Sequence, residues 1–167
     1  MERPTGEGPR RRRADDMPPR EMVSFRLGEQ DFCIDIMNVR EIRRWTAPTA
    51  LPHAPDHVLG LVNLRGAVLP VLDLSRRLGL TAESAAGPGA SGRAVVIVAM
   101  LGERVFGLVV DAVSDILSVP EEALRPVPAV GAAADPGLIQ GIAAVGGRMI
   151  RLLDLAGVLG VEPGGSA

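Results

Sequence analysis

Hydrophobic residues recur at every second position in short runs after residue 20, and turn signals separate these runs. Val23, Phe25 and Leu27 make up the first run, Gly28-Glu29 offers a two-residue turn, and Phe32 resumes the alternation. A period of two is typical of strands with one buried face, and a Gly-containing pair between two such runs is typical of a hairpin. The pattern therefore predicts a mostly β protein that is built from hairpins.

Three further hairpins follow from the same pattern, and Val39 and Ile42 continue an apolar face beyond the first one. The hairpins are expected at 59–64 and 67–72 around Arg65-Gly66, at 95–101 and 105–110 around Gly102-Glu103, and at 139–145 and 149–153 around Gly146-Gly147.

Short helices and loops are expected between the hairpins. Asp73 and Asp154 each follow a predicted strand and precede a short segment that ends at Gly79 or Gly160, which predicts two capped helices. Residues 120–124 predict one helical turn, because proline suits the first helical position. The proline-containing stretches at 47–56 and 125–137 predict loops.

The second half of the chain repeats the first. Residues of the first hairpin lie 74 positions before their counterparts, as Gly28 and Gly102 do, and those of the second hairpin lie 81 positions before theirs, as Gly60 and Gly141 do. A constant offset across turns, strands and caps favours an internal duplication. The matched residues are Gly28, Glu29, Phe32, Ile36, Val39 and Ile42 with Gly102, Glu103, Phe106, Val110, Val113 and Ile116, and Gly60, Gly66, Asp73, Leu74, Leu78 and Gly79 with Gly141, Gly147, Asp154, Leu155, Leu159 and Gly160.

The repeat predicts one domain at 21–161 that consists of two small antiparallel β-barrels. The first barrel half spans about 21–80, a Gly-rich linker spans 81–92, and the second half spans about 93–161. Each half is close to the lower size limit for independent stability, so we expect the halves to share a core. Residues 1–20 are rich in Pro, Gly and charge and are expected to form a disordered tail, and 162–167 form a second tail.

Composition narrows the classes of function. The 167 residues include three Phe, one Trp and no Tyr, with a formal net charge of −2, which argues against a nucleic-acid binder with aromatic stacking platforms. Cys33 is the only cysteine, so an intramolecular disulfide is excluded, and a reducing cytoplasm suits the chain. The longest apolar runs, within 95–101 and 105–110, are too short to span a bilayer, and the first twenty residues predict no secretory signal.

Three motifs look chemical, and each has a simpler interpretation. The G-x-G-x-x-G motif at 87–92 precedes a strand rather than a helix, so we interpret it as a flexible linker and not as a dinucleotide loop. His53 and His57 have a metal-ligand spacing, but the neighbouring prolines oppose the helix that this spacing needs. Asp73 and Asp154 suit helix caps better than an acid–base pair. We therefore predict no catalytic, cofactor-binding or metal-binding residues.

One position breaks the repeat. Gly146-Gly147 suits a tight turn, whereas the matching turn in the first half is Arg65-Gly66. A long planar cation thus stands in one half only. A solvated arginine at a turn tip is common, and a charged anchor for a partner is the alternative.

The residues around this turn carry a family resemblance. Residues 60–66 (GLVNLRG) and 69–74 (LPVLDL) resemble the signature of the CheW family, as do 34–42 (IDIMNVREI), 107–113 (GLVVDAV) and 152–155 (LLDL). The resemblance runs in colinear order from about residue 21 to 161. It implies two SH3-like five-stranded antiparallel β-barrels, in agreement with the duplication, and a protein without enzymatic activity.

The resemblance also implies a function. Members couple the cytoplasmic tips of chemoreceptors (methyl-accepting chemotaxis proteins) to the regulatory domain of a CheA-type histidine kinase in bacterial chemosensory signalling. The implied location is the cytoplasm, at receptor arrays beneath the inner membrane, with no cofactor, no nucleic acid and no direct membrane insertion. Arg65 matches an arginine implicated in receptor coupling, and Val113 and Ile116 match positions that line the groove between barrels. The implied partner-binding residues, not divisible between receptor and kinase, are Val39, Glu41, Gly60, Asn63, Arg65, Gly66, Val113 and Ile116.

Glu41 is a natural partner for Arg65, because the two have opposite charges and lie in the same barrel half beside candidate interface residues. We therefore predict an ion pair between them. Two other classes of function stay open at this point. The chain resembles the regulatory part of a larger kinase, although it contains no ATP-binding or phosphotransfer segment. An enzyme of an unfamiliar kind would bind a small molecule between the barrels.

Overall fold

A computed structural model describes residues 18–80, 94–127 and 137–160. The predicted linker 81–92 with its glycine motif and the predicted tail 162–167 lie outside the described residues. So do most of the predicted tail 1–20 and the middle of the predicted loop 125–137.

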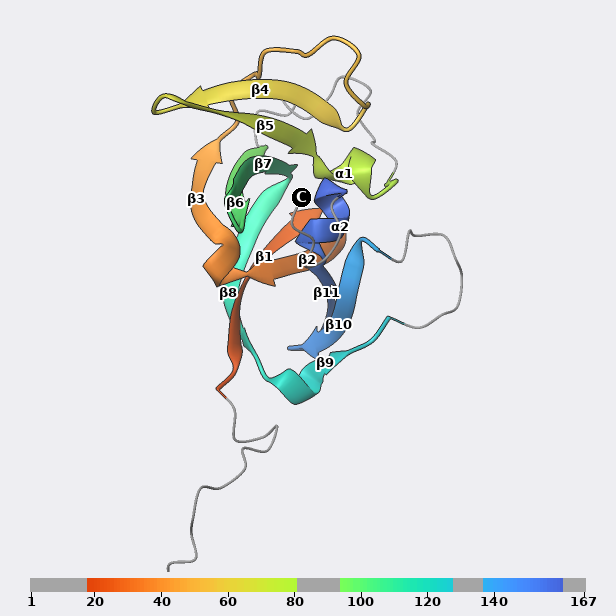
Figure 1. Ribbon diagram of the computed structural model, residues 1–167. Coiled ribbons are helices and arrows are strands. Elements are labelled where there is room, and N and C mark those ends of the chain that lie inside the picture. Colours follow the sequence, from red (N-terminus) through yellow and green to blue (C-terminus); the bar gives the residue numbers. More distant parts are fainter. Residues whose placement is uncertain (1–17, 81–93, 128–136, 161–167) are drawn as a thin grey trace, which may run out of the picture.

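The prediction of a mostly β fold is confirmed, and the hairpins fall where the alternation placed them (Figure 1). The described strands are β1 (Arg20–Leu27), β2 (Gln30–Asp35), β3 (Val39–Arg44), β4 (Val58–Leu64), β5 (Ala67–Asp73), β6 (Val95–Leu101), β7 (Arg104–Val110), β8 (Ala112–Val119), β9 (Leu124–Arg125), β10 (Ile139–Val145) and β11 (Arg148–Leu153). The helical segments are α1 (Leu74–Arg77), α2 (Leu155–Leu159) and the 3₁₀ turns η2 (Ile36–Asn38) and η4 (Glu121–Ala123).

The strands form two curved sheets (Figure 1), and each sheet takes strands from both sequence halves. The six-stranded sheet has the order β8-β1-β2-β11-β10-β9, and the five-stranded sheet has the order β3-β6-β7-β5-β4. The sheets therefore do not coincide with the halves 21–80 and 93–161. Each sheet also contains one parallel pair, β2 with β11 and β5 with β7, which the prediction of antiparallel barrels did not include. Strand β9 was not predicted: Leu124 was expected in a helical turn and Arg125 in a loop, because two residues are too few to show an alternation.

The exchange of strands between halves is symmetric, as a duplication requires. Val39 pairs with Ala99 where β3 meets β6, and Val113 pairs with Phe25 where β8 meets β1. The loops repeat too, because Asp73 N donates to the His57 carbonyl at 2.7 Å and Asp154 N donates to the Leu138 carbonyl at 2.9 Å. Each half therefore lends its first hairpin to the sheet of the other half.

The largest buried cluster lies between the two sheets and draws on both halves. Phe25 and Phe32 stack in it with ring centroids 6.0 Å apart, and Phe106 and Leu108 enter it from the other half. Smaller clusters fill the concave side of each sheet, one around Met22 and Cys33 and the other around Leu69 and Val98. The two sheets thus share one core, as the small size of each half predicted.

Both short helices begin at the predicted caps. An Asp73 carboxylate oxygen accepts from Arg76 N at 3.4 Å, and an Asp154 carboxylate oxygen accepts from Gly157 N at 3.0 Å. Gly160 ends α2 in the left-handed conformation, with φ of 79°. The interpretation of the two aspartates as helix caps is therefore confirmed.

Gly60 is fixed by the close approach of two backbone segments. It lies at a register shift in β4, with φ of +148°, and a Cβ atom there would lie 2.2 Å from the Thr49 carbonyl oxygen. That carbonyl accepts from Leu61 N at 2.8 Å, which holds the 45–57 loop against the edge of the five-stranded sheet. A side chain at position 60 would therefore displace this loop.

We expect Gly60→Ala to lower the free energy of unfolding by about 3 kcal/mol or more, because it combines a forbidden φ with a backbone clash. Urea unfolding measures the loss. Gly102→Ala is the matched control, since Gly102 has φ of +63° with no neighbour within 4 Å. It should lose only about 1 kcal/mol. Equal losses for the two variants would contradict the role given to the Thr49 carbonyl.

Candidate partner-binding site

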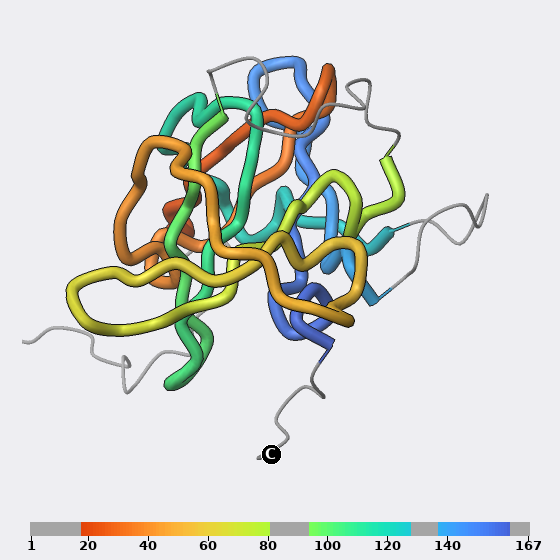
Figure 2. The backbone as a smooth tube through the Cα atoms, turned by 90° about the horizontal axis from the view of Figure 1, so that it is seen from above, coloured from red at the N-terminus to blue at the C-terminus, as the bar shows by residue number. Residues whose placement is uncertain are grey.

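The predicted ion pair between Glu41 and Arg65 is present. Arg65 stands at the tip of the β4–β5 hairpin, which projects from the body of the molecule (Figures 1 and 2), and Glu41 lies on β3. The guanidinium donates through Nη1 to Oε2 at 2.9 Å and through Nη2 to Oε1 at 3.3 Å, a bidentate arrangement. The Arg65 side chain remains 71% exposed, against 21% for Glu41. The pair thus joins edge strand β3 to the tip of the hairpin that contains the other edge strand, β4, and leaves a guanidinium surface open.

The electrostatics of the pair centre on the carboxylate. The hydrogen bond from Arg65 lowers the pKa of Glu41, and a second bond from Arg43 Nη1 at 3.3 Å acts in the same direction. Glu41 therefore stays charged through the neutral range, and the pair weakens as pH falls through the lowered pKa. Two arginines around one glutamate leave a surplus positive charge at this end of the sheet.

Arg65 holds this position in a backbone conformation that glycine prefers. Its φ is 54° and that of Gly66 is 88°, and the matching turn has Gly146 at 60° and Gly147 at 79°. The left-handed conformation costs a non-glycine residue about 1 kcal/mol. Asn63 supports the turn, since its side-chain oxygen accepts from Gly66 N at 2.9 Å. The arginine is thus kept at a small cost in stability, which favours a role for its side chain over chance.

The other predicted partner-binding residues divide into surface and support. Val39 and Val113 are half-buried and pack against the core between the sheets, and Gly60 is buried beneath the 45–57 loop. Ile116 is 59% exposed on β8, in the other sheet from Arg65. The structure therefore brings Glu41, Asn63, Arg65 and Gly66 together but places Ile116 and Val113 apart from them.

A set of hydrophobic residues is exposed at duplicated positions, and the sequence analysis named only Ile116 of them as partner-binding. Ile42 is 45% exposed and its counterpart Ile116 is 59% exposed, while Val68 at 61% matches Met149 at 56%. A third pair, Leu51 and Val127, follows from the loops, because Thr49 pairs with Leu61 as Arg125 pairs with Ile142. Large exposed hydrophobics that recur in both halves are typical of interaction surfaces rather than chance exposure. The offset of 81 was the signal that could have matched Val68 with Met149, as the offset of 74 matched Ile42 with Ile116.

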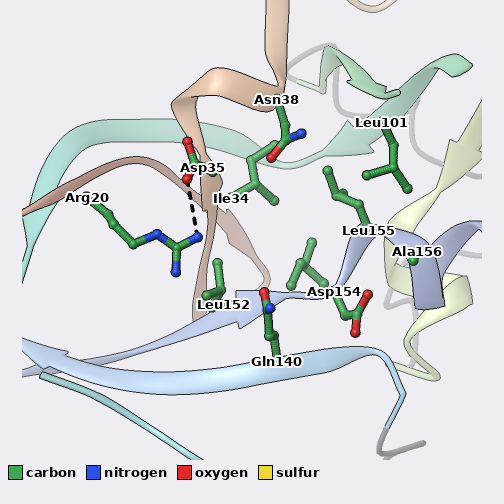
Figure 3. A pocket seen from close by; sticks show the side chains of 11 residues that line it. Arg20, Ile34, Asp35, Asn38, Leu101, Gln140, Leu152, Asp154, Leu155 and Ala156 are labelled. Atoms are coloured by element: carbon green, nitrogen blue, oxygen red, sulfur yellow. Dashed lines mark hydrogen bonds and ion pairs between the residues drawn. The ribbon is translucent and has the colours of Figure 1, made fainter. Parts of the chain in front are cut away.

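A pocket of about 240 Å³ opens where the two sheets meet (Figure 3). Its apolar side chains come from β2, β6, β11 and α2, and its polar side chains include Arg20, Asn38 and Gln140. Arg20 is held by Asp35 at 3.2 Å. The pocket is lined by Arg20, Ile34, Asp35, Asn38, Leu101, Gln140, Leu152, Leu153, Asp154, Leu155 and Ala156. Val113 and Ile116, which the resemblance placed along a groove between barrels, do not line this pocket.

The histidines form no metal site with other ligands in the described ranges, where no cluster of three His, Cys, Asp or Glu residues occurs. His53 lies in a loop with φ of 62°, so the helix that the metal spacing needs is absent there. Burial and nearby Arg77 lower the pKa of His57, which favours the neutral imidazole. Burial also raises the pKa of the Cys33 thiol to about 12, as for an inert core residue.

Residues 21–162 match the family model of the CheW-like domain. This chain belongs to the CheW-like domain family. It is 50% identical over 136 residues to the probable chemotaxis protein CheW of Rhizobium etli, which covers 81% of this chain and 84% of that protein. It is also 50% identical over 143 residues to the chemotaxis protein CheW of Rhizobium meliloti, with 86% and 89% covered.

The fold agrees with a solved member of this CheW-like family. The scaffolding protein TtCheW from Thermoanaerobacter tengcongensis superposes with a TM-score of 0.73 at 30% sequence identity, over 81% of this chain and 88% of that one. The family resemblance and the fold class inferred from sequence are therefore confirmed. Within the part of the chain that the structure describes, no helix has the length and apolar character needed to cross a membrane.

We expect Arg65→Gly to leave the free energy of unfolding unchanged or to raise it by up to about 1 kcal/mol. Glycine relieves the left-handed strain, and an exposed ion pair is strongly screened by solvent. Urea unfolding beside Arg65→Ala, which loses the same pair and keeps the strain, isolates the backbone effect. Arg65→Gly should be the more stable of the two. A clearly less stable glycine variant would contradict the assignment of strain to this turn.

Proposed function

We propose that this CheW-like protein is a non-catalytic adaptor that couples chemoreceptor tips to the regulatory domain of a CheA-type histidine kinase. The proposal rests on one observation above the others. Equivalent sets of exposed hydrophobic residues, Ile42 with Val68 and Ile116 with Met149, occur on two sheets that share a single core. A protein that joins partners needs separate binding surfaces in a fixed relation, and this duplication supplies them.

The Arg65 hairpin supports a coupling role at one of these surfaces. Its open guanidinium offers planar hydrogen bonds that fix the orientation of a partner, while exposed Val68 beside it offers apolar contact. The ion pair with Glu41 restrains the Arg65 side chain before the partner binds. Such preorganisation reduces the entropy lost on binding.

The pocket between the sheets supports the docking of a helical receptor tip. Ile34, Leu101 and Leu152 offer apolar contacts to the hydrophobic side chain of a helix, and Arg20, Asn38 and Gln140 suit its flanking polar groups. The exposed Met37 on η2, at 76%, adds a flexible apolar contact next to Asn38 in the chain. We assign the receptor to this junction and the kinase to the barrel ends, which are the surfaces around Ile42 and Val68 on the five-stranded sheet and around Ile116 and Met149 on the six-stranded sheet.

The alternatives receive less support. Among the described residues the paired aspartates are helix caps, and the pocket brings no carboxylate together with a histidine or cysteine for catalysis. The related proteins of the two Rhizobium species, of which this chain covers 84% and 89%, carry chemotaxis names. These points favour an adaptor over an enzyme. They also favour it over the regulatory part of a larger kinase.

We expect the protein to bind the regulatory domain of a CheA-type kinase from the same organism with one-to-one stoichiometry. The affinity should be near micromolar, about 8 kcal/mol, with array stability coming from multivalency. Calorimetric titration with the full chain measures it. Val68→Ser and Met149→Ser, which change exposed residues at equivalent positions, should show which barrel end contributes more. Glu103→Ser, at an exposed turn, is the control and should bind like wild type.

The proposal for the kinase fails if the wild-type chain gives no heat of binding up to about 1 mM, where association is worth only about 4 kcal/mol. Both serine variants must keep the wild-type unfolding transition for their binding data to count. A loss of binding in either of them, with the control unchanged, supports docking through the barrel ends.

A further inference from the structure

Asp115 occupies in β8 the place that Glu41 occupies in β3. The two acids lie at matching positions of the repeat, and each stands at a register shift, where Glu41 faces Val98 and Asp115 faces Ser24. The backbone of Asp115 is held there, because its N–H donates to Ser24 Oγ at 3.2 Å. The duplication thus provides an internal comparison between two carboxylates on the same scaffold.

The surroundings of the two carboxylates differ. Glu41 has Arg43 at 3.3 Å and Arg65 at 2.9 Å, whereas the matching positions around Asp115 hold Leu117 and Gly146. No ion pair to Asp115 occurs among the residues that the structure describes.

Arg148 of the β10–β11 hairpin pairs with a different acid. It donates to both carboxylate oxygens of Asp31, at 2.9 and 3.3 Å, and Arg26 lies 3.8 Å from the same carboxylate. Asp115 is itself exposed. It is therefore an acid without an ion pair at the position where the five-stranded sheet has Glu41 paired with two arginines.

The apolar surface around both acids is nevertheless similar. Ile116 follows Asp115 as Ile42 follows Glu41, and these isoleucines are 59% and 45% exposed. Met149 and Val68 repeat this similarity on the hairpins, at 56% and 61%. The pairing of the repeated acid, rather than apolar area, is therefore what distinguishes the surroundings of Asp115 from those of Glu41.

We infer that Asp115 is a specificity-determining residue that receives an arginine or lysine of the kinase regulatory domain when that domain docks against Ile116 and Met149. The inference rests on the proposed function and deepens it. Docking removes water from the carboxylate, and a partner without a cation would leave it buried and unpaired, which is strongly unfavourable. A partner that brings the cation supplies what Arg65 supplies to Glu41.

Asp115 is therefore a selective element of this surface. A partner surface without a cation opposite Asp115 is disfavoured because it leaves the carboxylate uncompensated, which is a common source of specificity between similar interfaces.

Calorimetric titration of the full chain with the kinase regulatory domain tests the inference. Asp115→Lys should weaken binding at least tenfold, and Asp115→Asn should weaken it less and flatten its dependence on NaCl between 50 and 300 mM. Glu103→Lys makes the same change in net charge on an exposed turn of the other sheet and should bind like wild type. The same series in a Val68→Asp background removes any contact through the five-stranded sheet that would mask the effect.

A second arm identifies the cation. Single Arg→Glu and Lys→Glu changes in the kinase domain should include one that restores binding to Asp115→Lys. If both Asp115 variants bind the kinase domain as tightly as wild type in both backgrounds, this inference is overturned and the proposed function stays intact. Absence of wild-type binding overturns both. If the Asp115 variants lose only self-association of the chain, as measured by sedimentation, the kinase domain is not the occupant of this surface.

Discussion

The structure depends on the burial of aromatic and aliphatic side chains between two sheets that neither half of the chain completes alone. Each half lends a hairpin to the other, so Phe25 and Phe32 enter the shared core from the first half and Phe106 enters it from the second. Hydrophobic burial contributes roughly 25 cal/mol per Å² of apolar surface, and a half of this size has too little surface to bury by itself. The exchange of hairpins therefore makes folding of the two barrels a single event.

A shared core has a consequence for function. Surfaces on two sheets that fold together keep a fixed separation and orientation, whereas surfaces on two tethered domains would not. The pocket at the junction draws side chains from both sheets, so its shape also depends on their packing. The duplication supplies equivalent positions on the two sheets, and single differences of charge distinguish them. Arg65 in a left-handed turn and Asp115 without an ion pair among the described residues are the two clearest of these differences.

Much of this could be predicted from sequence because its signals are local. Alternation placed the hairpins, the Asp–Gly spacing placed both capped helices, and a constant offset revealed the duplication. The pairing of Glu41 with Arg65 was predicted from their opposite charges and their place in the same barrel half. The exchange of hairpins between the halves was not predicted. A strand shows the same alternation of apolar and polar residues whether it pairs with strands of its own half or with strands of the other half. The exposure of Val68 and Met149 was not predicted either. The offset of 81 matches the two positions, but an apolar residue near the start of a strand does not show whether it is buried or exposed.

The central claim is that this rigid body carries separate surfaces that engage two partners at once. Sedimentation velocity of the full chain with a soluble receptor-tip hairpin and the kinase regulatory domain tests it most directly. The account predicts a complex that contains all three proteins, larger than either binary complex at the same concentrations. Two binary complexes that compete, with no ternary species as concentrations rise well above both dissociation constants, would contradict the claim.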